Sequence, residues 1–356
     1  MFRSLRLISC LLVLVTSVYS ARAEESIDSL LKKLPPPEKL VKAHVQQALE
    51  DPALKDPLAR NAISAADSGN YPRALALGRQ LTQKDPNSAY AHLLLGALAM
   101  EAKQYAESTS ALHASVKLES NHGITHLLLG VVEMKQSHWA AALSPLAEAE
   151  KLQPTWGVNY LLSSVCADHL GNHGESLSFA KRATAVEPDW IYAWIQLARA
   201  EKSAGHSQET LNAIVHAASL SGGSADMLAA VGFSYINLNK IPQAIQPLDR
   251  ASKIKPDDFL IQGQLGYCLE TVGQYGGAIS HLQEAVRLNP SYGPGWEQLG
   301  FAYQKLGKHF DAIKAYEHSV QLEPNIKKTW RQLGVEYRAV GRNADAQRAF
   351  ARGGGR

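Results

Sequence analysis

The sequence predicts an all-α protein built as a solenoid, which is a stack of similar helical units. Positions 34 residues apart carry related side chains along most of the chain, without insertion or deletion. Within each 34-residue segment, large residues recur three and four positions apart, which is the spacing of one helix face. A period of this size indicates units that bury their apolar faces only against their neighbours. The positions that define the phase are Leu58, His92, His126, Tyr160, Trp194, Leu228, Gln262, Trp296 and Trp330.

The last two units show the pattern most clearly. Each reads W-x2-L-G-x2-Y, starting at Trp296 and at Trp330, and continues with a small residue and an aromatic residue before Pro324 or the end of the chain. This pattern resembles the tetratricopeptide repeat, a helix–turn–helix unit. The resemblance implies a right-handed superhelix of about nine such units, in which the first helices of successive units line a concave groove.

Small residues and proline explain how each unit is built. Gly300 and Gly334 leave room where the two helices of a unit cross closely. Gly307 and Gly341 suit a left-handed C-cap, so we expect the first helix of the unit to end there. Pro324 stops the second helix and starts the next unit.

The phase divides the chain into a short leader and a repeat array. Residues 1–23 are predicted to be a signal peptide, residues 24–54 a leader with a capping helix, and residues 354–356 a short tail. The repeat array covers residues 55–353. Its predicted units are 55–88, 89–122, 123–156, 157–190, 191–224, 225–258, 259–292, 293–326 and 327–353.

The N-terminus predicts export. Arg3 and Arg6 precede a largely apolar run over residues 7–19, and Ala21-Arg22-Ala23 follows it. A basic start, a short apolar run and an A-x-A end are typical of a secretory signal peptide. We expect cleavage after Ala23 and a periplasmic or secreted protein without an integral membrane span. The alternative is an uncleaved N-terminal anchor.

Charge argues against nucleic-acid binding. The chain has 36 basic and 33 acidic residues, and removal of residues 1–23 takes away three arginines and no acid. The mature chain is therefore formally neutral, whereas nucleic-acid binding calls for a concentrated basic surface. The last two units carry local positive charge, which is interpreted either as a solvated face or as a surface for an anionic partner. These residues are Lys305, Lys327, Lys328, Arg331, Arg338, Arg342 and Arg348.

No constellation for catalysis is visible. The motifs H-E-x-x-H, G-x-x-x-x-G-K-[ST] and G-x-S-x-G are absent, so we predict a non-enzymatic protein without cofactor or metal. His92 and His126 share one repeat position, and we expect them to pack against a preceding helix, because zinc needs three or four converging ligands. Cys166 and Cys268 lie three units apart and are predicted to be buried thiols.

The groove positions that the resemblance implies are apolar in units two to four and more polar afterwards. One interpretation is an open groove that holds a peptide or a helix, because a contiguous exposed apolar patch marks an interaction surface. The other is that the strip is covered and belongs to the core. The candidate groove residues are Tyr90, Leu93, Met100, Ile124, Leu127, Val131, Met134, Val158, Leu161, Arg199, Lys202, Tyr267, Arg331 and Arg338.

These observations favour a binding function over a catalytic one. We expect a scaffold or adaptor of the cell envelope that binds a protein or peptide partner. The alternative is an accessory subunit that recruits an exported enzyme or polysaccharide or pilus assembly machinery. The last unit is followed by no polar capping element. Self-association through that end is therefore a further expectation.

Overall fold

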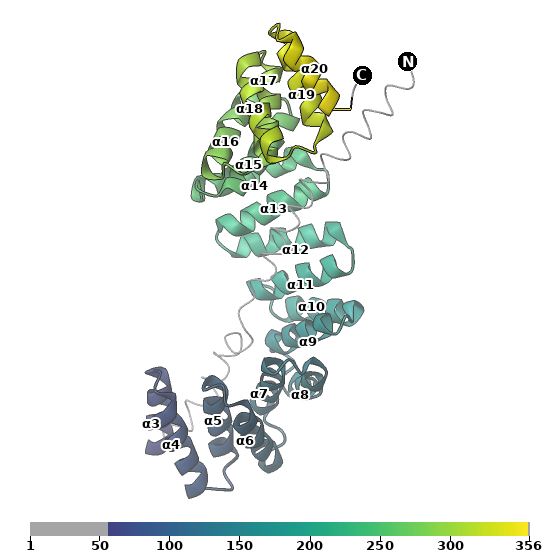
Figure 1. Cartoon of the computed structure of the whole chain (residues 1–356). Coiled ribbons are helices and arrows are strands. Elements are labelled where there is room, and N and C mark those ends of the chain that lie inside the picture. Colours follow the sequence, from purple (N-terminus) through teal and green to yellow (C-terminus); the bar gives the residue numbers. More distant parts are fainter. Residues whose placement is uncertain (1–55, 355–356) are drawn as a thin grey trace. The chain divides into compact units, whose positions relative to one another are not determined.

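The computed structural model describes residues 56–354, and this part of the chain folds into eighteen α-helices without a strand. The helices form nine pairs (Figure 1). The first helices of the pairs are α3 (Pro57–Asp67), α5 (Ala89–Glu101), α7 (Gly123–Lys135), α9 (Gly157–His169), α11 (Ile191–Ser203), α13 (Ala225–Asn237), α15 (Phe259–Thr271), α17 (Gly293–Lys305) and α19 (Lys327–Ala339). The second helices are α4 (Tyr71–Lys84), α6 (Tyr105–Leu118), α8 (Trp139–Leu152), α10 (His173–Val186), α12 (Ser207–Leu220), α14 (Ile241–Ile254), α16 (Tyr275–Leu288), α18 (His309–Leu322) and α20 (Asn343–Arg352).

The predicted all-α solenoid is confirmed. From the second pair onward, the first helices begin at the residues that open the predicted units. The signal peptide, the leader and the capping helix fall in residues 1–54, outside the described residues. None of the helices within residues 56–354 combines the length and apolar composition needed to cross a bilayer.

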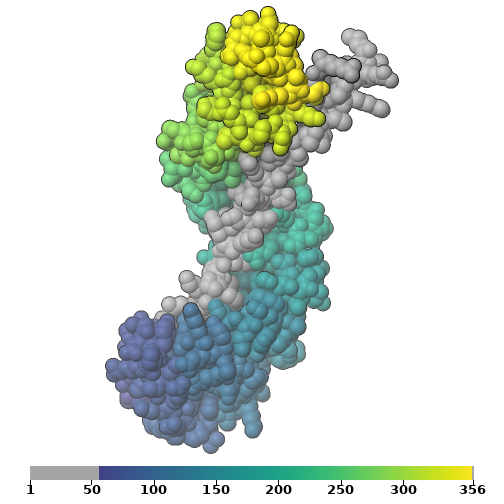
Figure 2. All heavy atoms as spheres, in the orientation of Figure 1, coloured from purple at the N-terminus to yellow at the C-terminus, as the bar shows by residue number. Residues whose placement is uncertain are grey.

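The described chain forms two compact parts, residues 56–213 and residues 214–354. Within each part, a helix packs against its pair partner, and a second helix packs against the first helix of the next pair, as α6 does on α7 and α16 does on α17. The space-filling view shows neighbouring pairs of one part in direct contact (Figure 2). Units that lie within one part are therefore buried by their neighbours, as the period predicts.

The turn inside each pair has a left-handed residue where the sequence places a helix end. Gly307 and Gly341 have φ of 67° and 77°, so the predicted C-caps are confirmed. Three units use a residue with a side chain at this position, namely Lys103, Ser137 and Asn239, with φ between 56° and 61°. The stack therefore imposes this turn even where glycine is absent.

The small position of the first helix lies against one residue of the second helix. A Cβ on Gly130 would lie 2.6 Å from Leu146 Cγ, and a Cβ on Gly300 would lie 2.7 Å from Tyr316 Cδ1. The contact residue always follows the glycine by sixteen positions. The other pairs of this kind are Gly96 with Leu112, Gly232 with Leu248, Gly266 with Leu282, and Gly334 with Phe350.

Candidate functional site

The apolar groove positions of units two to four are buried. Leu127, Val131 and Leu161 have no exposed surface, and the rest of the apolar set is at most 5% exposed. The expectation that this strip faces solvent is therefore wrong, and the structure agrees with the interpretation that it belongs to the core. The other members of the buried set are Leu93, Met100, Ile124, Met134 and Val158.

The reason lies in the helices that carry these residues. In α7, every residue from Gly123 to Val132 is buried, and so is Met134. A helix that is apolar and buried on all sides is a core helix rather than an amphipathic surface helix. Met100 and Met134 therefore fill core space, for which the flexible methionine side chain is suited.

The next candidate residues mark a transition from apolar to polar. Tyr90 is half-buried, and burial raises the pKa of its phenol to about 12. Arg199 and Lys202 are half-buried, and burial lowers the pKa of Arg199 while the Asp168 carboxylate counteracts it. Tyr267 is 7% exposed. Tyr90, Arg199 and Lys202 therefore remain partly accessible, whereas Tyr267 is buried.

The last two units place accessible side chains at the same positions. Phe301 and Lys305 follow one face of α17, and Arg331, Val335 and Arg338 follow one face of α19 at helical spacing. Val335 is 40% exposed, Lys305, Arg331 and Arg338 are exposed, and Phe301 is half-buried. We call these five residues the C-terminal strip. It combines apolar surface with positive charge.

A polar network fixes α17 against α19. Gln304 Nε2 donates to Glu336 Oε1 at 2.6 Å, and His309 Nδ1 lies 2.8 Å from Glu336 Oε2. Lys328 Nζ lies 2.9 Å from Glu297 Oε1. Glu336 is 1% exposed, so its carboxylate is satisfied by partners from two elements rather than by water. The network holds the backbone that carries the C-terminal strip.

One carboxyl group in this region, that of Glu270, has an unusually high pKa. Burial raises the pKa of Glu270 to about 8, and Glu297 adds to the increase, while Lys328 and Lys305 oppose it. Glu270 itself remains partly accessible. Near neutral pH this side chain is therefore largely protonated, which removes a negative charge from the neighbourhood of the strip.

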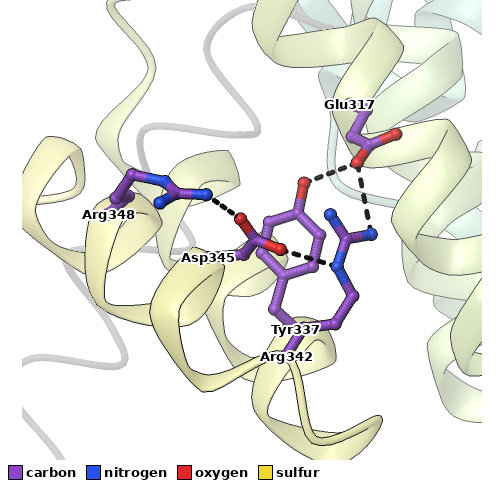
Figure 3. Close-up of polar contacts among 5 residues, drawn as sticks. All are labelled: Glu317, Tyr337, Arg342, Asp345 and Arg348. Atoms are coloured by element: carbon purple, nitrogen blue, oxygen red, sulfur yellow. Dashed lines mark hydrogen bonds and ion pairs between the residues drawn. The ribbon is translucent and has the colours of Figure 1, made fainter.

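Other basic residues of the last unit are neutralised by neighbours. Arg342 and Arg348 both bind the carboxylate of Asp345, and Arg342 also lies 3.9 Å from Glu317 (Figure 3). Tyr337 Oη donates to Glu317 at 2.5 Å in the same cluster. In contrast, Arg331 donates to the Gly353 carbonyl, and Arg338 lies 5.2 Å from the centre of the Phe350 ring. Within the described residues, neither of these two arginines has a carboxylate partner.

The two histidines that share a repeat position each bond to the turn before their helix. His92 Nε2 lies 2.9 Å from the Pro86 carbonyl, and His126 Nε2 lies 2.8 Å from the Ser120 carbonyl. Across residues 56–354, no group of three or more His, Cys, Asp or Glu side chains is placed to hold a metal ion.

The cysteines are free and buried, as predicted. Burial raises the pKa of each thiol, at Cys166 and at Cys268, to about 12. Both therefore stay protonated at neutral pH and act as small apolar side chains.

Comparison with known proteins agrees with the repeat geometry. Sequence profiles described as tetratricopeptide repeat match residues 60–117, 261–292 and 294–326. The chain is a tetratricopeptide repeat protein. The family resemblance predicted from the phase residues is thereby confirmed.

Solved tetratricopeptide repeat structures resemble parts of the chain. They include MamA, with a TM-score of 0.44 and 21% identity, covering 46% of this chain and 89% of MamA. A second is YrrB, titled a TPR protein with an unusual peptide-binding site, with a TM-score of 0.46 and 16% identity over 51% of this chain and 93% of YrrB. A third is MamA from Desulfovibrio magneticus RS-1, from residue 41 to its end, with a TM-score of 0.43 and 21% identity over 46% and 92% of the two chains. No curated protein sequence matches this chain.

Sequence reasoning missed a shared bond of these tetratricopeptide repeats. We call the residues that mark the 34-residue period, from Leu58 to Trp330, the phase residues. The side chain of a phase residue hydrogen-bonds to the backbone carbonyl six residues earlier, as Trp296 Nε1 does to Pro290 O at 2.9 Å. The pattern was present in the sequence, because the phase residues of most units carry a donor in their side chain. The period alone does not reveal the direction in which that side chain points.

Proposed function

We propose that this protein is a non-enzymatic scaffold that binds a protein partner through the C-terminal strip. The observation that carries the proposal is the exposure of Val335, Arg331 and Arg338 at positions whose counterparts in units two and three are buried. An amphipathic segment can bind a helix face on which apolar side chains and cations stand together.

The charge of this region specifies the partner further. Residues 293–354 contain ten Lys or Arg and six Asp or Glu residues, a formal net charge of +4 in a mature chain whose formal net charge is zero. Phe301 and Val335 supply the apolar contacts, and Lys305, Arg331 and Arg338 surround them. The partner segment is therefore acidic with at least one apolar anchor, and electrostatic attraction speeds its association.

Quantitative affinity capture from an extract of the source organism tests this proposal. The wild-type chain is compared with a Lys305→Glu, Arg338→Glu variant, which reverses two charges of the strip. Lys253→Glu, Lys314→Glu is the matched control, because both of its lysines are exposed on second helices. We expect a partner whose recovery falls at least tenfold with the first variant and stays unchanged with the control.

Two results would contradict the proposal. One is equal recovery of every retained protein by the Lys305→Glu, Arg338→Glu variant and by the control variant, when circular dichroism shows that both are folded. The other is loss of recovery with the control variant alone. Raising the salt concentration is an independent check, because attraction between exposed charges is screened.

We further propose that this scaffold works in the cell envelope. The support is the basic start, apolar run and A-x-A end of residues 1–23. The intact mass of the protein isolated from the source organism tests it. A mass that starts at Glu24 is expected, and a mass that includes residues 1–23 contradicts cleavage.

Self-association remains a competing use of the same end of the chain. Val335 is exposed there, whereas Phe350 is half-buried against Gly334. Light scattering at micromolar concentration separates the two uses. A monomer leaves the strip free for another protein, and a dimer that Arg338→Glu dissolves assigns the strip to a second copy.

A further inference from the structure

The phase residue of almost every described unit closes the same hydrogen bond. In units two to nine, seven of the eight phase residues bond to the carbonyl six positions earlier. The pairs are His92 with Pro86, His126 with Ser120, Tyr160 with Pro154, Trp194 with Pro188, Gln262 with Pro256, Trp296 with Pro290, and Trp330 with Pro324. The exception is unit six, where Leu228 has no donor to offer to the carbonyl of Gly222.

A second contact of the phase residue is also incomplete in unit six. Where the phase residue is a ring, the side chain 22 positions later often covers its face. Arg182 lies 4.2 Å from the centre of the Tyr160 ring, Arg352 lies 4.6 Å from that of Trp330, and His318 stacks on Trp296 at 4.5 Å. In unit six this position is Arg250. Its guanidinium is therefore present without the ring of a phase residue beneath it.

The space of the missing ring is open. A cavity of about 570 Å³ lies between α12, α13 and α14, and it is lined by Leu228, Val231, Gly222 and Arg250 among others. The equivalent cavity two units later, at Trp296, measures about 330 Å³. Smaller side chains account for the difference, because Leu228, Ala218 and Ser219 stand 68 positions before Trp296, Val286 and Arg287.

The cavity is reachable from solvent. Val215 at its wall is 40% exposed, and Gly222 and Arg250 are exposed. A Cβ added to Gly222 would meet no atom within 4 Å, so the space beside this residue is open. A ligand side chain can therefore reach the backbone of this turn.

We propose that this cavity binds a tryptophan side chain of a partner protein. Two groups at its wall have no ring of a phase residue against them. They are the backbone of Gly222, in a turn whose two glycines have positive φ unlike the turns of the other units, and the Arg250 guanidinium. An indole can engage both, because its nitrogen is a donor and its face attracts a cation. Leu228, Val231 and Val215 complete an apolar floor and wall.

The occupant comes from outside the chain's own N-terminal region, because residues 1–55 contain no tryptophan. The site shares no residue with the C-terminal strip, so it goes beyond the proposed function and gives the scaffold a second docking surface. The proposals for the cavity and for the C-terminal strip can be tested independently, because charge reversal at Lys305 and Arg338 changes no residue that lines the cavity.

Saturation-transfer NMR on the full mature chain tests the proposal. The probe is N-acetyl-L-tryptophanamide, and N-acetyl-L-leucinamide is the control ligand of similar backbone. We expect the tryptophan probe to bind with a dissociation constant in the millimolar range, roughly what a single buried ring supports. The leucine amide should bind at least about tenfold more weakly, because it has neither the donor nor the ring.

Two variants make the test specific. Leu228→Trp places the chain's own indole in the cavity, so binding of the probe should be lost. Arg250→Ala removes an exposed side chain, and it should weaken binding of the probe about two- to fivefold. Equal binding of both ligands to the wild type, no detectable binding of the tryptophan probe, or unchanged binding to Arg250→Ala overturns the proposal. Unchanged binding to a folded Leu228→Trp variant does so too.

Discussion

At the scale of single residues, the phase side chains of the last two units combine a local hydrogen bond with partial burial. The indoles of Trp296 and Trp330 are only partly buried, although large residues at such a position suggest core. Each donates to a carbonyl at the end of the preceding unit, at 2.9 Å and 2.8 Å. The phase residue therefore ties a helix start to the turn before it.

Replacement of Trp296 by leucine tests this role. The variant loses one hydrogen bond and the stacking on His318 but keeps an apolar side chain. We expect the free energy of unfolding to fall by about 1–2 kcal/mol, measured from urea midpoints. Trp296→Phe retains the ring and should lose about half as much. A loss above about 4 kcal/mol would mean that the indole is core after all.

Glu270 makes stability depend on pH. Its pKa is about 8 in the folded chain against an ordinary 4.5, so the folded state holds this proton more tightly than the unfolded state does. The folded state therefore pays no penalty below about pH 4.5, and stability is lost as pH rises toward 8. Glu270→Gln removes the dependence. Its stability relative to wild type should increase by about 1–3 kcal/mol between pH 5 and pH 8 in urea melts. An identical difference at both pH values would be evidence against this titration.

At the scale of elements, the crossing of two helices in a unit depends on one pair of positions. Gly130 on α7 faces Leu146 on α8, and the fourth unit has Ser164 and Ala180 at the same two places. A larger residue on the first helix is matched by a smaller one on the second. The two positions therefore share one volume rather than contributing separately.

Substitution at Gly130 tests this shared volume. Gly130→Ser places a Cβ 2.6 Å from Leu146 Cγ and should cost about 1–3 kcal/mol. Combined with Leu146→Ala, it recreates the fourth unit, so the double variant should lose less than the sum of the single losses. Gly174→Ala on α10 is the control, because its Cβ would meet no atom within 4 Å. Strict additivity in thermal melts would contradict the pairing.

The elements themselves could be predicted from sequence, because their limits are local. Gly307 and Gly341 end their helices where the left-handed turn is placed, and Pro324 stops α18 two residues after Leu322. The burial of Leu127 and Val131 could not be predicted in the same way. It depends on what surrounds α7 in the folded stack, and a 34-residue period contains no information about that. The network of Glu336 with Gln304 and His309 likewise depends on how one unit lies on the next.

At the scale of the whole molecule, the units divide into buried and accessible first helices. Val131 has no exposed surface, whereas Val335, six units later at the same repeat position, is 40% exposed. The same residue type at the same position therefore serves the core in one unit and a surface in another. Among the described residues, this position is buried in units two and three and accessible in the last unit.

One pair of substitutions measures this division. Val131→Asp buries a charge and should cost at least about 3 kcal/mol, with a large fall in melting temperature. Val335→Asp should change stability by less than about 0.5 kcal/mol, because the carboxylate stays in water. Thermal melts of the two variants under one buffer decide the comparison. Similar losses would show that the strip is also core.

The most direct test of the central claim is site-specific photo-crosslinking in cells of the source organism. Benzoylphenylalanine is placed at Val335 on α19 or, as the matched control, at Leu322 on α18, which is 41% exposed against 40% for Val335. If the C-terminal strip is the partner-binding surface, irradiation yields a covalent adduct with a second protein from position 335 and not from position 322. An adduct from position 322 alone, or equal adducts from both positions, would contradict it.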